Sequence, residues 1–255
     1  METPPFRYLS AADVASAMPA VEERLELAAR TMVALVEDAQ LPPKIGVRPT
    51  PEQSFGHAMP AWMRGPAADG SEDLMGIKWV VGFPANAAAG LPAIHGTVIL
   101  SDASTGVPRA VMDAGAITAQ RTAAVSGAAI ARWGPRRRAS ETRVAVIGAG
   151  VQARSHLPVI SHLLPDSELM LCDRDPQRLE ALYHEVNTGS AGLGSFSDVH
   201  TTTDPVGAID GADLVVTIVS FGPQRQSIPE AAFASAATVV AVDYDMCVPA
   251  SLAAG

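Results

Sequence analysis

The chain has 255 residues, of which 48% are hydrophobic and 18% charged, and a mean hydropathy of +0.18. This apolar content excludes a disordered chain and suffices for one large domain core or two ordinary ones. A net charge of −9 and a pI near 5.1 exclude a general binder of nucleic acids or of anionic membranes.

Targeting and redox signals predict a soluble cytoplasmic protein. Residues 1–13 lack the basic and apolar regions of a secretory signal, and no apolar run approaches the ~18 residues that a membrane span needs. The two cysteines, Cys172 and Cys247, fit neither a disulfide framework nor a metal-ligand pattern. We expect them to be small core residues in a reducing compartment, with no metal site.

The first half of the chain predicts two helices and then an antiparallel sheet. Ser10 and Asp13 have capping-box spacing, and a second helix over residues 20–39 would pack one apolar face. The residues of that face are Val21, Leu25, Ala28, Met32 and Val36. Over residues 42–113, strand-like runs alternate with turn residues, most clearly in MGIKWVVGF, AIHGTVILS and PRAVMD. SDASTGVP is typical of a hairpin turn between the last two runs.

The second half predicts alternating strands and helices. A helix from about Thr118 to Trp133 leads into it, and Asp175 and Pro176 have the N-cap and first-turn positions of a later helix. Strands are expected at residues 143–147, 168–172, about 199–202, 213–219 and 238–243. This alternation indicates an α/β fold with a doubly wound parallel sheet. We place the boundary between the two domains, 1–125 and 126–255.

The segment RVAVIGAGVQARSH combines a strand, a glycine turn and a helix start. Gly148, Gly150 and Ala153 form G-x-G-x-x-A, which allows a tight turn and close approach of the backbone to a pyrophosphate at the helix N-terminus. Asp173 follows 25 residues after Gly148, where a carboxylate can accept hydrogen bonds from the adenosine ribose. The pattern therefore predicts a dinucleotide site of the Rossmann type. Asp173 favours NAD because it would repel a 2′-phosphate, while Arg174 could hold that phosphate and keeps NADP open.

Three cations of the first half are candidates for binding an anion. Lys78 interrupts the apolar run MGIKWVV, and Arg121 lies among small residues in ITAQRTAAV. A buried charge is costly unless it is paired, so an anionic ligand is the favoured explanation for both. Arg48, in KIGVRPTP, fits an ordinary surface charge equally well.

The last strand delivers Asp243 and Asp245 to the carboxyl end of the sheet, where ligands bind in doubly wound folds. A carboxylate there could act as general base beside a nicotinamide, and helix capping or a turn is the alternative role. His57, His95 and His156 are interpreted as hydrogen-bonded structural residues.

Residues 78–131, followed by VAVIGAGVQARSH, resemble the ornithine cyclodeaminase/mu-crystallin family. The pair LP, the turn TGVP, the run ITAQRTAA and the loop G-x-G-x-Q-A carry the resemblance. It extends from about Arg48 to Asp245, and more weakly over the N-terminal helices. It implies a Rossmann domain with an α+β substrate-binding and dimerisation domain. It also implies hydride transfer between a nicotinamide cofactor and the α-carbon of an amino acid or cyclic imine.

The resemblance assigns roles to the matching positions. Arg48, Lys78 and Arg121 match cations that bind the substrate carboxylate, and Asp245, with Lys78, matches the catalytic groups. The implied cofactor-binding residues are Arg121, Thr122, Gly148, Gly150, Val151, Gln152, Ala153, Asp173, Arg174, Thr217 and Ser220. Ala93 stands where some members have a threonine that touches the cofactor.

Two departures from the family pattern concern activity. Many members read D-x-P-G-K after the catalytic aspartate, and this chain reads MCVPAS after Asp245, without the lysine. Members also continue into a C-terminal segment that completes the first domain and the active-site wall. We therefore expect a fragment, or a shortened member whose pocket is open or completed by another chain.

The resemblance implies a homodimeric, NAD-dependent enzyme of amino-acid metabolism. In the cyclodeaminase version, ornithine is oxidised to an iminium, loses ammonia on ring closure and receives the hydride back to give proline. Net oxidation or reduction, as in alanine dehydrogenase-like or ketimine reductase-like members, is an alternative. A non-catalytic, crystallin-like protein that binds a dinucleotide and a small ligand is another.

Overall fold

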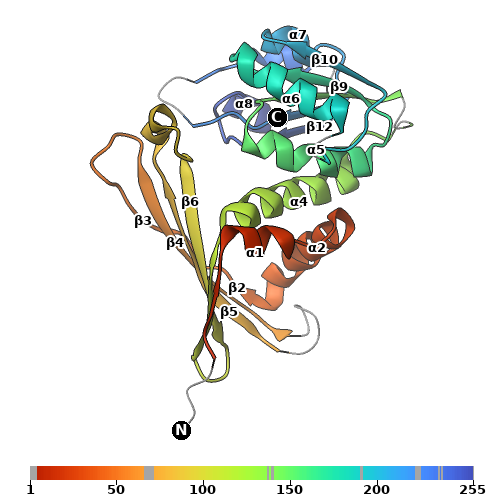
Figure 1. Cartoon of the computed structure of the whole chain (residues 1–255). Helices are drawn as coiled ribbons and strands as arrows, with labels where there is room; N and C mark the ends of the chain where they lie inside the picture. Colours follow the sequence, from red (N-terminus) through yellow and green to blue (C-terminus); the bar gives the residue numbers. More distant parts are fainter. Residues whose placement is uncertain are drawn as a thin grey trace. The chain divides into compact units, whose positions relative to one another are not determined.

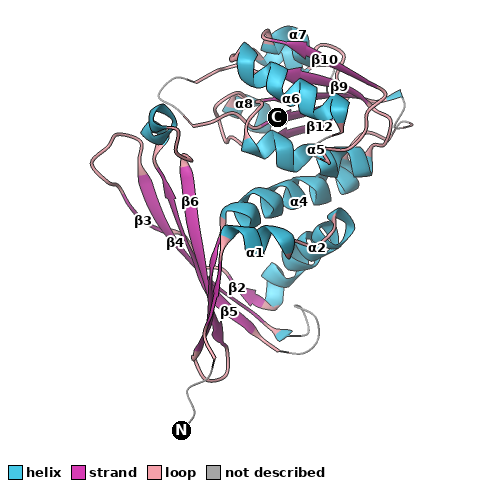
Figure 2. Ribbon diagram, viewed as in Figure 1, coloured by secondary structure: helices cyan, strands magenta, loops and turns pink. Residues whose placement is uncertain are grey.

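The structure is a computed structural model that describes residues 5–65, 72–136, 138, 141–189, 192–221, 225–234, 236 and 238–254. Contacts divide the chain into two compact units, Met1–Arg121 and Thr122–Gly255. Within the described residues each unit has its own sheet, as Figure 1 and Figure 2 show. The division falls inside α4 (Gly115–Trp133), the helix that also contains the boundary expected between residues 125 and 126.

The first unit contains the two expected helices, α1 (Ala11–Ser16) and α2 (Val21–Glu37). The capping box of α1 is confirmed. The Ser10 hydroxyl accepts a hydrogen bond from the Asp13 N–H at 3.3 Å, and the Asp13 carboxylate accepts one from the Ser10 N–H at 2.9 Å. Figure 1 shows α1 and α2 on one side of the sheet of this unit.

The packing face predicted for α2 is correct in its first half and wrong in its second. Ala28 is buried, but Met32 is 45% and Val36 79% exposed, and Ala34 is buried instead. Apolar positions spaced four apart drift around a helix of 3.6 residues per turn. The second half of α2 is therefore buried through the small Ala34, and its large apolar side chains point outward.

The sheet of the first unit is antiparallel, as predicted, except at one edge. Its order over the described residues is β1-β7-β6-β5-β4-β2, and β3 also pairs with β4. The strands are β1 (Arg7–Leu9), β2 (Ala39–Gln40), β3 (Ile45–Val47), β4 (Phe55–Met63), β5 (Leu74–Gly82), β6 (Ile94–Asp102) and β7 (Pro108–Asp113), with a 3₁₀ helix, η1 (Pro84–Ala89), between β5 and β6. β1 pairs with β7 in parallel and, at three residues, is too short to leave a sequence pattern.

Strand β4 has a proline in its interior, at Pro60. β3 pairs with residues 56–58 of β4 and β2 pairs with residues 62–63, so Pro60 lies between these two paired stretches. A proline cannot donate to a strand ladder, and this gap on one side of the strand accommodates it. The hairpin turn predicted between β6 and β7 is confirmed, and Asp102 accepts hydrogen bonds there from the backbone N–H groups of Ser104 and Thr105.

The two faces of this sheet differ in exposure away from the strand ends, where Leu74 and Ile94 on the Lys78 face are 49% and 43% exposed. Val80 and Ala110 are buried on the same face as Lys78, whose Nζ lies 3.5 Å from the Thr118 hydroxyl on α4. On the opposite face four large apolar side chains are between 40% and 70% exposed. We call these residues the open sheet face: Ile45, Val47, Trp79 and Ile99.

The second unit is a doubly wound parallel sheet, as predicted. The strand order is β10-β9-β8-β11-β12 and every pair is parallel. The strands are β8 (Arg143–Ile147), β9 (Glu168–Cys172), β10 (Asp198–Thr202), β11 (Leu214–Thr217) and β12 (Thr238–Ala241). β11 and β12 end before the expected residues 219 and 243, because the Asp243 carboxylate accepts the Val219 N–H at 3.1 Å beyond the strands. The order reverses between β8 and β11, the switch point where such folds bind ligands.

Helices cover both faces of this sheet, and each face has its own core. Val144 and Val146 of β8 point to a core with Leu157 of α5, while Ala145 and Ile147 point to a core on the other side. The helices are α5 (Val151–Leu163), α6 (Pro176–Thr188), α7 (Pro205–Ile209), the 3₁₀ helix η3 (Glu230–Phe233) and α8 (Ala250–Ala254). Alternation of buried residues to both faces is what a doubly covered parallel sheet requires.

Both cysteines lie in this second unit and are buried, as predicted. Burial, together with the nearby carboxylates of Asp173 and Asp243 respectively, raises the pKa of the Cys172 and Cys247 thiols to about 12. The helix α6 has the predicted Asp175 cap and Pro176 start, with the Asp175 carboxylate accepting the Gln177 N–H at 3.0 Å. Within the described ranges no helix is both long and apolar enough to span a membrane.

Candidate functional site

The glycine turn after β8 has a conformation that requires glycine. Gly148 has φ of +118°, and a Cβ on it would lie 2.9 Å from the carbonyl oxygen of Ile218. The Gly148 N–H donates to the Cys172 carbonyl at 2.7 Å, which ties the turn to the end of β9. A side chain at this position would be strained and would displace β11, so the first glycine of the motif is needed for the fold itself.

The second glycine borders open space. Gly150 has an extended backbone just before α5, and a Cβ there would meet nothing within 4 Å. Among the described residues no side chain caps this helix end, so the first-turn N–H groups of α5 have no side-chain acceptor there. Ala153 is fully buried one turn later. The helix N-terminus is thus accessible to an anion beside Gly150, while Ala153 packs against the core.

Asp173, at the end of β9, is attached to this turn. Its Oδ2 accepts the Ala149 N–H at 2.7 Å and its Oδ1 accepts the Asp175 N–H at 2.9 Å. A carboxylate has about four acceptor sites. Asp173 therefore keeps lone pairs for ribose hydroxyls while it holds the glycine turn, and Arg174 is exposed beside it.

The end of β11 contributes Thr217 and Ser220 at the switch point. Thr217 is fully buried and its hydroxyl donates to Asp243 at 2.9 Å, whereas Ser220 is exposed. Burial raises the pKa of Asp243, opposed by the hydrogen bonds from Val219 and Thr217. Asp243 is 2% exposed and joins β11 to β12, so its side chain has a structural role.

Asp245 lies two residues further and has the opposite environment. Tyr244 between them has φ of +58°, a left-handed conformation that is uncommon for a non-glycine residue and turns the chain at this point. The Asp245 side chain is 50% exposed and forms an ion pair with Arg225, which is 63% exposed. Arg225 stands in the run RQSIPE, which carries no recognisable motif, so the sequence offered no signal for this partner.

The loop that carries Arg225 is paired to the loop that carries Asp245. The Gln226 N–H donates to the Met246 carbonyl at 2.8 Å and the Ile228 N–H to the Cys247 carbonyl at 3.0 Å. The ring centroids of Phe221 and Tyr244 are 5.4 Å apart. Asp245 is thus held by a neighbouring loop at the carboxyl edge of the sheet.

Two of the three cations predicted in the first unit, Lys78 and Arg121, lie near each other. Lys78 is half-buried on β5, and its pKa is lowered to about 8 by burial and by the charges of Arg121 and Lys44. Lys44 also acts with Arg48 on His57, whose pKa is lowered chiefly by burial. Lys78 and Arg121 therefore lie near each other together with Lys44, which sequence reasoning missed because LPPKIG is typical of an ordinary loop. The burial expected for Arg121 is wrong, since Arg121 is exposed. Arg48 is also exposed, and it is connected to Lys44 only through its effect on His57.

The remaining predicted residues have individual surroundings. Val151 is 71% exposed in the first turn of α5, and Thr122 is half-buried on α4. Gln152 has a buried Oε1 that has no hydrogen-bond partner among the described residues. Ala93 is exposed, and its carbonyl accepts the Phe83 N–H at 2.7 Å.

His156 is structural, as expected. It is fully buried, with Nδ1 2.8 Å from the Gln152 carbonyl and Nε2 3.0 Å from the Ser126 hydroxyl. Because a carbonyl only accepts, Nδ1 must carry a proton, and burial lowers the pKa of the ring so that the neutral form is favoured. His156 therefore connects α5 to α4.

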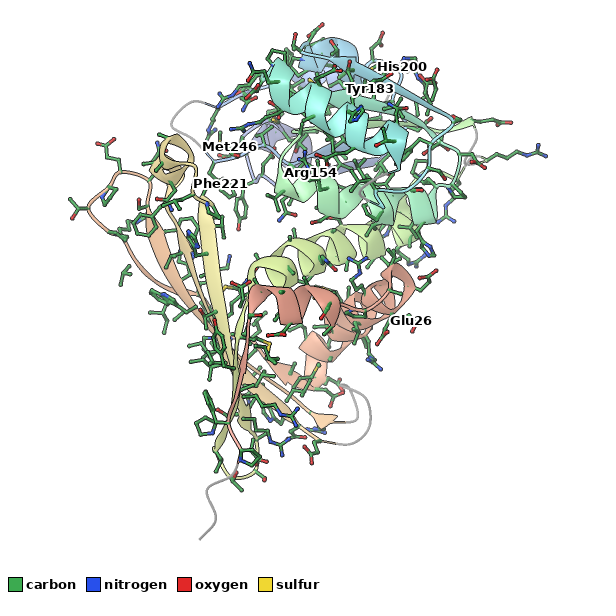
Figure 3. All side chains as sticks on the ribbon, viewed as in Figure 1. Glu26, Arg154, Tyr183, His200, Phe221 and Met246 are labelled. Carbon is green, nitrogen blue, oxygen red and sulfur yellow. The ribbon has the colours of Figure 1, made fainter. Side chains whose placement is uncertain are left out.

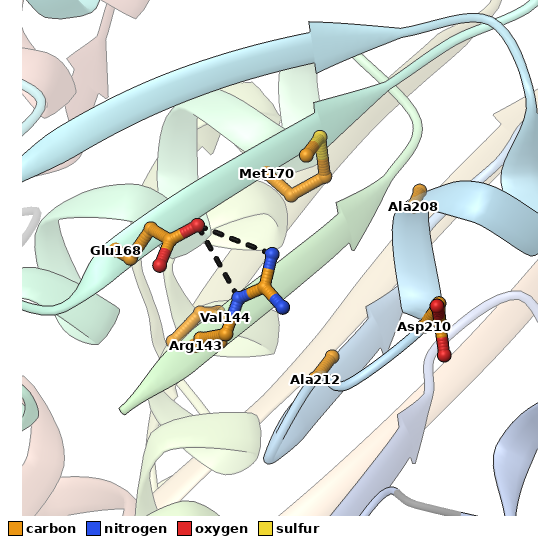
Figure 4. A pocket seen from close by; sticks show the side chains of 7 residues that line it. All are labelled: Arg143, Val144, Glu168, Met170, Ala208, Asp210 and Ala212. Carbon is orange, nitrogen blue, oxygen red and sulfur yellow. Dashed lines mark hydrogen bonds and ion pairs between the residues drawn. The ribbon is translucent and has the colours of Figure 1, made fainter. Parts of the chain in front are cut away.

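The opposite edge of the parallel sheet carries a shallow depression, shown in Figure 4. Arg143 at the start of β8 bonds Glu168 at the start of β9, at 3.2–3.3 Å. This edge holds the amino ends of the strands, so it is the wrong edge for a ligand of a doubly wound fold. Within the described residues no group of three His, Cys, Asp or Glu side chains is placed to hold a metal ion.

The carboxyl edge fits a dinucleotide. It has a turn that only glycine can form, open space at Gly150, an uncapped helix start and a carboxylate with acceptor capacity 25 residues after Gly148. These are the groups that hold a pyrophosphate and a ribose in Rossmann folds.

Comparisons with known proteins agree with this geometry. The nodulation efficiency protein NfeD of Rhizobium meliloti is 33% identical over 217 residues, which cover 85% of this chain and 62% of the relative. The ketimine reductase mu-crystallin of Mus musculus is 30% identical over 153 residues, or 60% of this chain and 45% of the relative. The chain thus spans less than two thirds of the length of these relatives.

Two solved structures share the fold. The Δ1-pyrroline-2-carboxylate reductase of Thermococcus litoralis, solved with NADH and L-proline, has a TM-score of 0.73 at 24% identity, over 86% of this chain and 62% of that one. An archaeal alanine dehydrogenase dimer with bound NAD has a TM-score of 0.69 at 27% identity, over 87% and 62%. A family match covers residues 9–230. The chain therefore belongs to the ornithine cyclodeaminase/mu-crystallin family.

Proposed function

We propose that the protein binds NAD and catalyses hydride transfer at the α-carbon of a small amino acid or of its imine. The observation that carries this proposal is the glycine turn, fixed by Gly148 and tied to Asp173 at the switch point of the parallel sheet. Two related proteins support this proposal: one is named a ketimine reductase, and the other is an alanine dehydrogenase solved with NAD.

NAD is preferred to NADP because of the charge and hydrogen bonding of Asp173. The carboxylate already accepts two backbone N–H groups and has lone pairs left for the 2′- and 3′-hydroxyls of a ribose. A 2′-phosphate in the same place would meet its negative charge. Arg174 is the residue that would bind such a phosphate if NADP were the cofactor.

The substrate carboxylate would bind the cations of the first unit. Burial lowers the pKa of Lys78 most, and the positive charges of Arg121 and Lys44 lower it further. An anion bound beside Lys78 would offset both the burial of its charge and this repulsion. A half-buried lysine offset by a carboxylate ligand is less costly than one left unpaired. A small amino acid or imino acid provides such a carboxylate next to its reactive carbon.

The nicotinamide, when bound, supplies the hydride acceptor or donor. Asp245 would take the proton from the substrate amine, or from water, as the α-carbon is oxidised. Since Arg225 pairs with Asp245, a substrate ammonium group would exchange for this guanidinium. Asp243 is unsuited to the task because it is buried and bonded to Thr217 and Val219.

The same ion pair also favours the second candidate, a non-catalytic protein that binds a dinucleotide and a small ligand. In that case Arg225 would hold Asp245 permanently and the carboxylate would only shape the site. The two candidates differ in whether Asp245 is needed for turnover.

We also propose a homodimer formed through the first unit. The open sheet face, Ile45, Val47, Trp79 and Ile99, is a row of exposed apolar side chains that a second copy could cover around a two-fold axis. The related archaeal alanine dehydrogenase is a dimer.

The test is NADH absorbance measured over a panel of amino acids and cyclic imines, with ammonia measured in parallel. Net NADH change supports oxidation or reduction, and ammonia release without net change supports cyclodeamination. Asp245→Asn should lower turnover by ~10²–10⁴-fold with NADH affinity unchanged, because it removes a general base. NADH binding with no turnover of any substrate would instead support the non-catalytic candidate.

A further inference from the structure

The middle residue of the glycine turn is held from both sides by charged groups. The Ala149 N–H donates to Asp173 at 2.7 Å, and its carbonyl accepts a hydrogen bond from Arg154 Nη1 at 3.0 Å. The same Nη1 lies 3.3 Å from the Gly150 carbonyl. Arg154 projects from the first turns of α5 and is labelled in Figure 3.

Arg154 is itself fixed by a second helix. Its Nε and Nη2 donate to the two carboxylate oxygens of Glu185 on α6, both at 2.7 Å. The hydrogen bond from Arg154 lowers the pKa of Glu185 and is the largest influence on it. A bidentate pair fixes the plane of the guanidinium, which leaves Nη1 directed at the turn.

The two held carbonyls determine where the neighbouring N–H groups point. In a trans peptide the C=O and the N–H lie on opposite sides. With the Ala149 carbonyl turned toward the Arg154 guanidinium, the Gly150 N–H is turned away from it. The Gly150 carbonyl is turned to Arg154 as well, where it also accepts the Arg154 backbone N–H at 3.4 Å, so the Val151 N–H is turned away by the helix and the side chain together. An unrestrained turn could instead present carbonyl oxygens, which would repel a phosphate.

We propose that Arg154 is a positioning residue that sets the glycine turn in its phosphate-binding conformation before the cofactor arrives, with Glu185 holding Arg154 in place. Arg154 does this through the two carbonyls and without contact to the cofactor. The inference rests on the proposed dinucleotide site and adds a preorganising role for the α5–α6 ion pair.

The chain offers a matched control in the same unit. Arg143 also bonds a glutamate, Glu168, from a neighbouring element, with comparable exposure of the two side chains (46% and 32%, against 34% and 29% for Arg154 and Glu185). This pair lies at the amino ends of β8 and β9, as Figure 4 shows, and not at the glycine turn. Loss of either pair removes an arginine–glutamate contact, but only one loss should affect the turn.

The experiment is fluorescence titration of NADH into wild type, Arg154→Met, Arg143→Met, Glu185→Gln and Arg154→Lys. We expect Arg154→Met to bind NADH about tenfold more weakly, as it would if the competent turn were populated about one tenth of the time. Arg143→Met should stay within about twofold of wild type. The NADH affinities of Glu185→Gln and Arg154→Lys should lie between those of wild type and Arg154→Met. Each of these variants keeps a donor near the carbonyls but loses the bidentate pair.

A second readout needs neither cofactor nor turnover. Hydrogen exchange of the segment 148–153 should become faster in Arg154→Met than in Arg143→Met, at matched free energies of unfolding. Equal weakening of NADH binding in both variants, or unchanged exchange and binding in Arg154→Met, overturns the inference. If wild type fails to bind NADH, the proposed function fails, and the exchange comparison still decides whether Arg154 orders the turn. If Arg154→Met does not fold, Glu185→Gln provides the same comparison.

Discussion

The two sheets of this chain differ in how they are covered. In the second unit the strands β8 and β11 are buried along almost their whole length, and each face of the sheet has its own core. In the first unit one face packs on helices, while the open sheet face and the outer side of α2 leave large apolar side chains exposed. The second unit buries most of its apolar side chains within itself, and the first leaves the apolar surface on which the proposed dimer rests.

This comparison separates two kinds of apolar residue that look alike in the sequence. Val146 and Val36 both stand in apolar runs, yet Val146 is fully buried and Val36 is 79% exposed. A parallel strand between two helical layers has to be apolar throughout. An apolar residue on the outside of a helix or sheet has no such role within one copy of the chain, and the proposed dimer would give it one.

The largest expected effect comes from the core of the second unit. Leu157→Ala removes a fully buried side chain and should lower the free energy of unfolding by ~2–5 kcal/mol, the range for large-to-small core changes. Val36→Ala, at an exposed site of α2, should cost less than ~0.5 kcal/mol. Urea unfolding followed by circular dichroism gives both values. Similar losses at the two sites would mean that α2 is covered after all.

Next in size is the effect of Trp79→Ala on association. Trp79 lies over Gly56 at the centre of the open sheet face, and truncation of a buried interface tryptophan typically costs ~2–4 kcal/mol. Sedimentation equilibrium should show a dimer in wild type that dissociates in the variant. Val36→Glu on α2 is the comparison. If it dissociates the dimer and Trp79→Ala does not, the interface is formed by the helix and not by the sheet.

Asp173→Ala should weaken NADH binding by ~1.5–3 kcal/mol, the value of charge-assisted hydrogen bonds. The loss has two parts, since Asp173 is expected to bind the ribose and also holds the Ala149 N–H. Calorimetry with NADH and NADPH measures both affinities. Tighter binding of NADPH by wild type would assign recognition of the adenosine ribose to Arg174.

The smallest expected effect is the pH dependence caused by Lys78. Its pKa of about 8 means that it loses its proton as the pH rises through 8, so the affinity for a carboxylate ligand should fall about tenfold between pH 7 and pH 9. Titration of L-proline and L-alanine into the NADH-loaded protein measures this. Lys78→Met should bind weakly and without that pH dependence, and an unchanged wild-type affinity at pH 9 would remove Lys78 from the site.

The same residue should also affect stability, in the opposite direction. Between pH 8 and the ordinary lysine pKa of 10.5 the unfolded chain keeps a proton that the folded chain has lost. The free energy of unfolding should therefore rise with pH over this window. The rise should be absent from Lys78→Met.

The sequence predicted the second unit well because local signals and global fold agree there. The strand β8, the glycine motif, the cap at Asp175 and the position of Asp173 each have a signature within a few residues. The first unit was predicted in class but not in detail. The edge strand β1 is too short to show a pattern, and the buried side of α2 depends on what the helix packs against.

The residues of the candidate site also differ in how well the sequence predicts them. Residues with a motif, such as Gly148 and Asp173, could be found from the chain alone. The residues that pair with site residues only in the folded structure could not be found in this way. Arg225 reaches Asp245 from twenty residues away and Glu185 reaches Arg154 from another helix, and neither stands in a recognisable pattern.

The position of the two cysteines makes the second unit chemically distinguishable from the first. The sequence contains only Cys172 and Cys247, both are buried in the parallel-sheet unit, and their pKa values of about 12 leave almost no reactive thiolate at neutral pH. A maleimide or iodoacetamide reagent should therefore react only when that unit opens. The labelling rate therefore measures how often the second unit opens. Unfolding confined to the first unit should leave this rate unchanged.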